Sequence, residues 1–536
     1  MKYALRLNNA VIFSVICCVS TQLYAGELTI SPTLSTSLVS SQTSVPDSEN
    51  IEANILSISP TISATFNGSR VTGDLSIRHN HLQQDIDNQG LNDADSSENF
   101  TDILYSFESQ LLENVITLFA NGGQSQRNLN ASQSLVNDEF LGSESLSKTQ
   151  NNTIGLEFIV PNPTYLGMTL RAESSNVKSD RQTNSEAKLS SKDKNLQATL
   201  FQGTSFSKFG LNVNGQYRET SGSLDNDLTS WNVNGLMTFK FIDHIQFVLS
   251  GSKEQNERGN DSVASINNLS NDTYGIGFGW FTSNDRFINI TYNSASQIDD
   301  ERSKFLGVDV KWRLTRMTNI EATYGRRFFG KSGSFSLNHN NRKVRTSITY
   351  TEDVTTFSRL VLNNDSTGVF VCPNGDTSLN SCFQPTDPTY QLQLGEQFTN
   401  LQILVPDISE EVLLSKNLNA SIGFTRRKMN ILLSLLYNDT SFLETSRRQT
   451  SKSANLSVSY AANRNTNVEL GLNNALTNSS TDNSDTKTWS ASLGLSRQLG
   501  RHLSSNLAYR FLKRESSFNA NDLIDRRLTL SMIYTF

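Results

Sequence analysis

The chain has 536 residues and a formal net charge of −6, with 36% hydrophobic and 18% charged residues. Its mean hydropathy of −0.40 excludes a bundle of membrane helices, and without a basic excess nucleic acid is not an expected partner. Low apolar content combined with few charges, many small polar residues and plentiful aromatic residues is typical of a sheet with one apolar and one wet face.

Residues 1–25 are predicted to be an export signal peptide. Lys2 and Arg6 provide a positive start, a short apolar core follows, and Ala25 is a small residue just before the expected cleavage point. The core is shorter than the ~20 apolar residues that a membrane helix needs, so an N-terminal anchor helix is the less favoured alternative. Removal of the two basic residues leaves a mature net charge of 44 − 52 = −8.

The mature chain, residues 26–536, alternates apolar and polar residues with a period of two. In residues 58–66, 306–314 and 489–495, every second residue is apolar apart from a single proline, and the residues between are small, hydroxylated or charged. Strict alternation places all apolar side chains on one face of a strand. We expect strands of about 9–13 residues, the length that crosses a bilayer at a tilt. A soluble sandwich would alternate too, but its large dry core needs more apolar residues.

Short and long connections alternate along the chain, as in outer-membrane barrels with tight periplasmic turns and long external loops. Short connections are predicted at residues 113–114, 161–164, 242–244, 283–285, 315–318, 427–429 and 498–501. Long ones are predicted at residues 39–54, 82–100, 127–151, 179–194, 257–271, 353–411, 441–451 and 514–525. A short turn near Gly330, on the long-loop side, is the exception. The predicted fold is a single all-β antiparallel transmembrane barrel of about 24 strands (22–26), with both termini on the short-turn side.

The last strand of the chain ends on an aromatic residue. Tyr534 and Phe536 share a face with three apolar residues before them. This ending resembles that of bacterial outer-membrane barrels, which implies recognition by the barrel assembly machinery. We therefore expect the protein in the bacterial outer membrane, in contact with lipid and lipopolysaccharide.

Nine charged residues fall on the polar phase of their strands and are predicted to face the lumen. An Arg or Lys facing lipid at mid-depth would cost about 2–4 kcal/mol. These side chains either tune passage through a wet channel or simply pair across the wall, and the pattern favours neither interpretation. The nine are Glu157, Arg171, Asp309, Lys311, Arg313, Glu321, Arg327, Glu469 and Arg510.

The longest predicted connection, residues 353–411, carries both cysteines of the mature chain. Cys372 and Cys382 are predicted to form a disulfide in an oxidising compartment, because a metal site needs more ligands than two thiols. Loops of this length are often functional. This one either folds into the lumen as a constriction or stands outside the barrel.

No catalytic motif stands out, so the sequence predicts neither an enzyme nor a cofactor or metal. His79, His81 and Asp85 share one strand face and are the best candidate metal ligands, but two solvated imidazoles are the simpler interpretation. The acidic residues between 85 and 98 either bind divalent cations at the lipopolysaccharide surface or remain solvated.

Three stretches carry a resemblance to a known family. They are SENIEANILSISPTISATFNGSRVTGDLSIRHN, EATYGRRFFGKSGSFSLNHNNRKVRTSITYTED and SEEVLLSKNLNASIGFTRRKMNILLSLLYND, with residues 324–330 and 412–427 the most specific parts. Together they resemble the PEP-CTERM system-associated outer-membrane β-barrel family. That family is associated with exosortase sorting systems and exopolysaccharide loci. The resemblance implies a role with polysaccharide export components, and it carries over no residue roles.

The sequence thus leaves several functions to compare. The first is a wide outer-membrane channel, porin-like, for exopolysaccharide or another large polar solute. The second is a non-conducting surface barrel that acts as an adhesin or biofilm-matrix anchor. A TonB-dependent receptor is not expected, because the strand pattern begins almost at Glu27 and leaves no room for an N-terminal plug. A soluble secreted β-protein is the remaining alternative.

Overall fold

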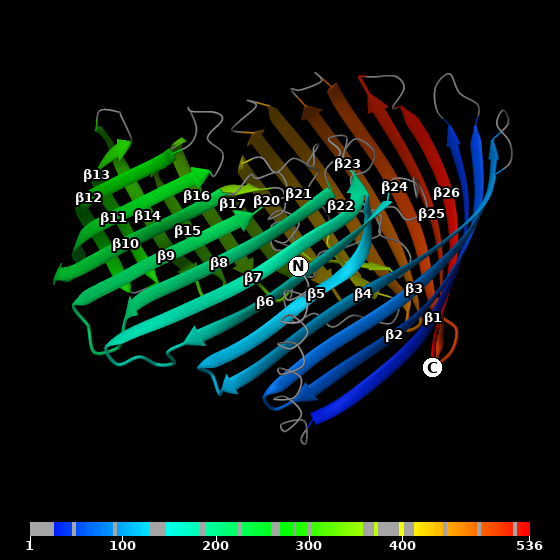
Figure 1. The fold of residues 1–536 in the computed structure, drawn as a ribbon, viewed down its shortest axis with the longest axis horizontal. Coiled ribbons are helices and arrows are strands. Elements are labelled where there is room, and N and C mark those ends of the chain that lie inside the picture. Colours follow the sequence, from blue (N-terminus) through cyan, green and yellow to red (C-terminus); the bar gives the residue numbers. More distant parts are fainter. Residues whose placement is uncertain are drawn as a thin grey trace, which may run out of the picture.

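The computed structural model is dominated by one closed antiparallel sheet of 24 strands (Figure 1). It describes residues 26–44, 50–88, 94–128, 146–182, 188–221, 228–258, 268–283, 285–297, 302–327, 329–356, 369–373, 396–400, 412–442, 447–479, 484–517 and 522–536. Within these residues no helix is long and apolar enough to span a membrane. The predicted signal peptide, residues 1–25, lies outside the described residues.

The first half of the wall runs from β1 to β13. Its strands are β1 (Gly26–Ser44), β2 (Ile51–Gly68), β3 (Val71–Asn88), β4 (Ala94–Leu112), β5 (Ile116–Asn128), β6 (Leu146–Ile159), β7 (Leu166–Gln182), β8 (Lys188–Gln202), β9 (Phe209–Ser221), β10 (Leu228–Ile242), β11 (Ile245–Arg258), β12 (Asn268–Ser283) and β13 (Arg286–Gln297).

The second half runs from β14 to β26, and β18 and β19 form a separate two-stranded sheet. These strands are β14 (Ser303–Thr315), β15 (Thr318–Arg327), β16 (Gly330–Asn340), β17 (Val344–Thr356), β18 (Val369–Pro373), β19 (Glu396–Asn400), β20 (Val412–Arg426), β21 (Met429–Phe442), β22 (Arg448–Asn463), β23 (Thr466–Ser479), β24 (Ser484–Gln498), β25 (Leu503–Ser516) and β26 (Leu523–Thr535).

Each strand of the wall pairs with its neighbours in sequence, with β17 joined directly to β20. β26 pairs with β1 from Thr33 opposite Thr535 to Ser44 opposite Ile524, and this seam closes the cylinder. Closure gives every strand of the wall a partner on both sides, so no sheet edge is exposed, which is what a sheet needs in lipid. The predicted all-β barrel and its strand number are therefore confirmed. The start of β1 and the end of β26 both lie on the short-turn side, as predicted.

The tight connections occur where the sequence predicted them. The turns after β10, β14, β20 and β24 fall at residues 243–244, 316–317, 427–428 and 499–502. In the short turns after β4, β6, β10 and β20, one residue each (Asn114, Asn162, His244 and Arg427) adopts a positive φ angle of 40–72°, in the left-handed region. The expected short turn on the opposite side is also present, with Gly330 at φ 114°.

The predicted strand lengths are wrong, because the ladders extend far into the expected long loops. Wall strands have 10–19 residues. β1 and β2 pair through Val39 and Ile55, and β3 and β4 continue to Ile86 opposite Ala94. Above the lipid both faces of a strand meet water, so hydrophobic alternation weakens although the hydrogen bonds continue. The pattern therefore marked only the part of each strand that faces lipid.

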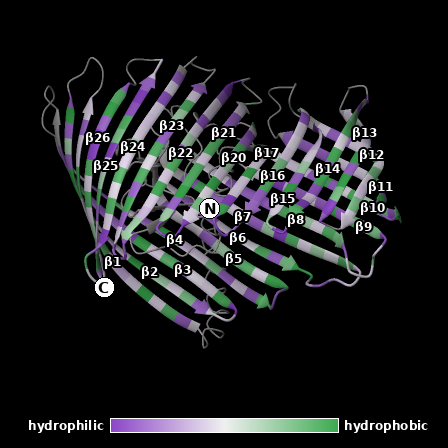
Figure 2. Cartoon of the chain, turned by 180° about the vertical axis from the view of Figure 1, so that it is seen from behind, coloured by the Kyte–Doolittle hydropathy of each residue, from purple (hydrophilic) through white to green (hydrophobic). Residues whose placement is uncertain are grey.

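The outward face of the wall is apolar. On β12, Tyr274, Ile276 and Phe278 are 65%, 59% and 69% exposed, and they alternate with small residues that point inward. Figure 2 shows the same alternation of hydrophobic and hydrophilic bands on most strands. Large apolar side chains exposed on the outside of a closed barrel are the pattern of a wall that faces lipid.

Aromatic side chains bound the apolar band on β10. Phe239 packs against Phe209 near the short turns, with 5.2 Å between ring centroids, while Trp231 lies eight positions further up the same strand. Eight residues of a strand tilted by 35–45° span about 20 Å, which approaches the ~25 Å apolar band of outer-membrane barrels. The protein is therefore a transmembrane barrel of the bacterial outer membrane.

Candidate functional site: the luminal wall

All nine charged residues predicted to face the lumen lie on the face of their strand opposite to the lipid-exposed apolar residues. The pairing register of the strands shows their orientation, because two residues that are directly opposite each other on neighbouring strands point to the same face of the sheet. Glu157 is opposite Arg171, Lys311 is opposite Glu321, and Asp309 is opposite Asn289. Glu469 is opposite Ser459, on the other face from the exposed Leu470.

Most of these charges are paired within the wall. Four ion pairs join members of the predicted set to one another or to near neighbours. Lys311 lies 3.1 Å from Glu321, Arg171 lies 3.9 Å from Glu157 and 3.2 Å from Glu173, and Arg313 lies 2.9 Å from Asp285. Asn289 donates to Asp309 at 3.3 Å. The inward charges thus largely neutralise one another, which lowers the net field that a solute meets.

The seam of the barrel holds a buried ionic cluster that the sequence revealed only in part. Arg510, which was predicted to line the lumen, lies 3.0 Å from Asp525, and Arg527 lies 3.8 Å from the same carboxylate. Thr43 of β1 donates to Asp525 at 3.3 Å across the seam. Asp525 is fully buried. This cluster ties β25, β26 and β1 together, so it holds the first and last strands of the barrel.

A row of inward glycines shapes β12. A Cβ atom at Gly275 or Gly279 would overlap the side chains of Asn293 or Asn289, and one at Gly277 would overlap the backbone carbonyl of Ile290. The free space lets polar side chains reach across β12 from both flanks. The backbones of β11 and β13 come within 8 Å of each other, so β12 forms a tight corner of the barrel.

Side chains bridge this corner. Gln246 of β11 donates to Asn289 of β13 at 2.7 Å, and Ser250 donates to Asn293 at 2.9 Å. Gln246, Asn289 and Asn293 are buried. Because amides and hydroxyls satisfy one another here, the corner is filled by a hydrogen-bonded polar layer and not by an apolar core.

Near the outer end of the same region, opposite walls meet across the lumen. Arg327 of β15 makes a bidentate pair with Glu254 of β11, at 2.6 and 3.1 Å. Arg218 of β9 lies 3.5 Å from Asp353 of β17, although seven strands separate them along the wall. We call strands β9–β17 the β9–β17 lobe. These two bridges pin its outer end.

The environment of Arg327 keeps its guanidinium charged. Arg327 lies above the apolar band, three residues beyond Tyr324. Burial lowers the pKa of Arg327, but hydrogen bonds and charge from Glu254, helped by Asp353 and Glu352, outweigh it and raise the pKa. The bridge therefore persists over the whole range in which the carboxylates are ionised.

One patch on the inward face is apolar, contrary to the expectation that all apolar side chains point outward toward lipid. Val39, Ile55, Leu82 and Phe100 form a buried cluster on β1–β4. Val39 alternates with Leu38, which is exposed on the lipid side, so Val39 points inward. The cluster lies in the outer extension of the wall, where lipid no longer dictates which face is apolar.

The candidate metal ligands do not form a site. His79 and His81 face outward on β3 and hydrogen-bond Thr101 at 2.9 Å and Asn99 at 2.7 Å. In the part of the chain that the structure describes, no three His, Cys, Asp or Glu side chains gather around a common point. Cys372 lies in β18 opposite Gln397, while its predicted disulfide partner, Cys382, lies outside the described residues.

The predicted assembly signal lies at the short-turn end of β26. Tyr534 and Phe536 pack edge to face, with ring centroids 4.8 Å apart, and the backbone N–H of Phe536 donates to Pro32. The two rings share the lipid side of the wall. Their recognition by the assembly machinery stays a prediction.

Comparison with protein-family models gives no match, and neither does comparison with curated proteins. Several solved structures are similar. The siderophore receptor PirA from Acinetobacter baumannii is 10% identical with a TM-score of 0.43, covering 95% of this chain and 81% of that chain. For the FrpB iron transporter from Neisseria meningitidis (F3-3 variant) these values are 10%, 0.44, 95% and 81%, and for the copper transporter OprC 10%, 0.40, 96% and 80%. Similarity this distant does not extend to cargo or mechanism.

Proposed function

We propose that this protein is an outer-membrane channel for large polar solutes and that its cargo is an exopolysaccharide or its precursor. The supporting observation is the chemistry of the inward face. Its charges are mostly paired, and Asn, Gln, Ser and Thr side chains dominate the rest. Such a face exchanges hydrogen bonds with sugar hydroxyls at little cost, and it lacks the strong net field that would select small ions. A barrel of 24 strands is also wider than the 16–18-stranded barrels that already enclose a water channel.

The proposed cargo rests on the family resemblance as well as on the wall. The stretches around residues 324–330 and 412–427 resemble barrels linked to exosortase and exopolysaccharide loci. In the structure, the first is the β15–β16 turn and the second is the β20 strand. Both are wall elements, so the proposal concerns transport through the barrel and assigns no catalytic residue.

Planar-bilayer recording tests the channel. The purified protein is expected to produce large conductance steps with weak preference between K⁺ and Cl⁻, and long neutral polysaccharide added on one side should reduce the current. A variant that replaces residues 357–411 with a short linker keeps β17 and β20 intact. If neither form conducts, the transport proposal is wrong.

A surface-binding role is the second candidate, and one observation favours it. Beyond Tyr105, which pairs with Leu75, the β3–β4 ladder continues for eleven further residues to Ile86 opposite Ala94. That is about 35 Å of strand above the apolar band. Such a projecting rim suits display of loops to extracellular polymer. Binding of polysaccharide to intact cells without any change in permeability would favour this role over the channel.

A further inference from the structure

Three cationic side chains lie on the outward face of β14, β15 and β16, near the loop-side ends of these strands. Arg326 of β15 is directly opposite Lys331 of β16. Lys304 lies near the outer end of β14, on the same face as the exposed Leu306. The pairing of β14 with β15 starts four residues further along β14, at Val308 opposite Tyr324. We call Lys304, Arg326 and Lys331 the rim cations. Like charges placed opposite each other in a sheet repel, so this arrangement destabilises the wall unless an anion lies between them.

No side chain of the described residues supplies that anion. None forms an ion pair with a rim cation, and Arg326 Nε is buried without a hydrogen-bond partner. Other cations on the outward face, by contrast, have carboxylate partners on neighbouring strands. Lys194 lies 3.0 Å from Glu219, Lys253 lies 3.8 Å from Asp272, and Arg448 lies 2.6 Å from Asp439. Among the residues that the structure describes, carboxylates of the wall therefore neutralise these three cations, and none neutralises a rim cation.

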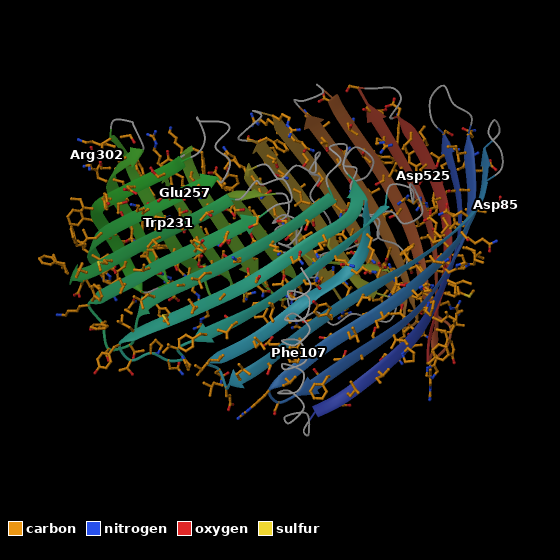
Figure 3. The ribbon with its side chains drawn as sticks, viewed as in Figure 1. Asp85, Phe107, Trp231, Glu257, Arg302 and Asp525 are labelled. Atoms are coloured by element: carbon orange, nitrogen blue, oxygen red, sulfur yellow. The ribbon has the colours of Figure 1, made fainter. Side chains whose placement is uncertain are left out.

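The position of the rim cations relative to the apolar band indicates which part of the membrane lies next to them. Tyr324 and Tyr292, both exposed on the lipid side, mark the top of the apolar band on β15 and β13. Arg326 is two residues above Tyr324, which is about 5 Å higher on a tilted strand. Aromatic rings at this position mark the membrane–water interface, so the rim cations lie at the level of lipid headgroups. In Figure 3, the nearby Arg302 lies at the loop-bearing rim, above Trp231.

We propose that Lys304, Arg326 and Lys331 bind the phosphate groups of lipid A, the phosphorylated glycolipid of the outer leaflet. Phosphate oxygens accept charge-assisted hydrogen bonds from guanidinium and ammonium groups. The acyl chains lie against Leu306, Tyr292 and Tyr324 below. A phosphate between Arg326 and Lys331 removes their repulsion, so the bound lipid stabilises this edge of the β9–β17 lobe. The site does not depend on whether the barrel conducts.

Native mass spectrometry of the full-length mature barrel in neutral detergent tests the site. The probes are bisphosphorylated lipid A and the same lipid A after enzymatic removal of both phosphates. The unaltered protein is expected to bind the phosphorylated form at least tenfold more tightly. The triple variant Lys304→Gln, Arg326→Gln, Lys331→Gln should lose this preference.

A matched triple variant controls for net charge. Lys194→Gln, Lys253→Gln, Arg448→Gln removes the same number of positive charges from paired positions, and it should bind lipid A as the unaltered protein does. A second variant, Lys331→Glu, gives Arg326 an internal partner; it should lose lipid A while resisting heat better than the triple variant. Equal binding of both forms of lipid A, or equal loss in both triple variants, would overturn the site.

Discussion

Replacing Gly277 with alanine is expected to destabilise the barrel by about 3 kcal/mol and to lower its amount in the outer membrane. A Cβ atom at this position overlaps the backbone carbonyl of Ile290 on the neighbouring strand. Backbone cannot rotate away as a side chain can, so β12 and β13 must separate or slip. Because β12 forms the tight corner of the β9–β17 lobe, that slip also breaks the amide bridges across it.

Gly251 on the adjacent strand is the matched control. No atom lies within 4 Å of a Cβ built there, so Gly251→Ala should fold as the unaltered protein does. Urea unfolding in lipid vesicles, followed by Trp fluorescence, gives the free energy of unfolding of both variants. Equal stability of Gly277→Ala and Gly251→Ala would show that β12 has room for a Cβ atom at residue 277 and that the corner is loosely packed.

The second large effect is expected at the Glu254–Arg327 bridge. Either Glu254→Gln or Arg327→Gln leaves a largely buried charge without its partner, at a cost of about 2–3 kcal/mol in unfolding free energy. The double variant should cost little more than one single variant, because neither charge is then left unpaired. The coupling energy from the four proteins should reach about 2 kcal/mol.

The exposed pair Lys194–Glu219 provides the comparison for this cycle. Its side chains are 64% and 32% exposed, so water screens the interaction and its coupling should stay below about 1 kcal/mol. The same urea titration measures both cycles. If the two coupling energies are equal, the Glu254–Arg327 bridge contributes no more to the free energy of unfolding than an exposed ion pair does.

Hydrophobic alternation was enough to predict the barrel, because lipid acts on every residue of the spanning part in the same way. Residues 58–66 show it: the apolar positions face lipid and the hydroxyls face inward. The tight turns were equally visible, since they interrupt two alternating runs. The outer extensions were not, because His79 and His81 face water on the outside while Val39 and Ile55 are apolar on the inside.

The sequence placed nine charged residues on the inward face but could not show their partners. Arg218 and Asp353 are 135 positions apart in the chain, and they meet only because β12 bends the wall back on itself. One signal for this bend was present: Gly275, Gly277 and Gly279 recur with the period of a strand. Read as inward positions, they predict a face that lacks side chains and can therefore curve sharply.

Single cysteines along residues 61–66 of β2 test the central claim most directly, in a background without other cysteines. In lipid vesicles, cysteines at Thr61, Ser63 and Thr65 should react with a water-soluble thiol reagent. Those at Ile62, Ala64 and Phe66 should react only with a lipid-dissolved reagent. Reactivity without this two-residue period, or with the two sets exchanged, would contradict a barrel that is polar inside and covered by lipid outside.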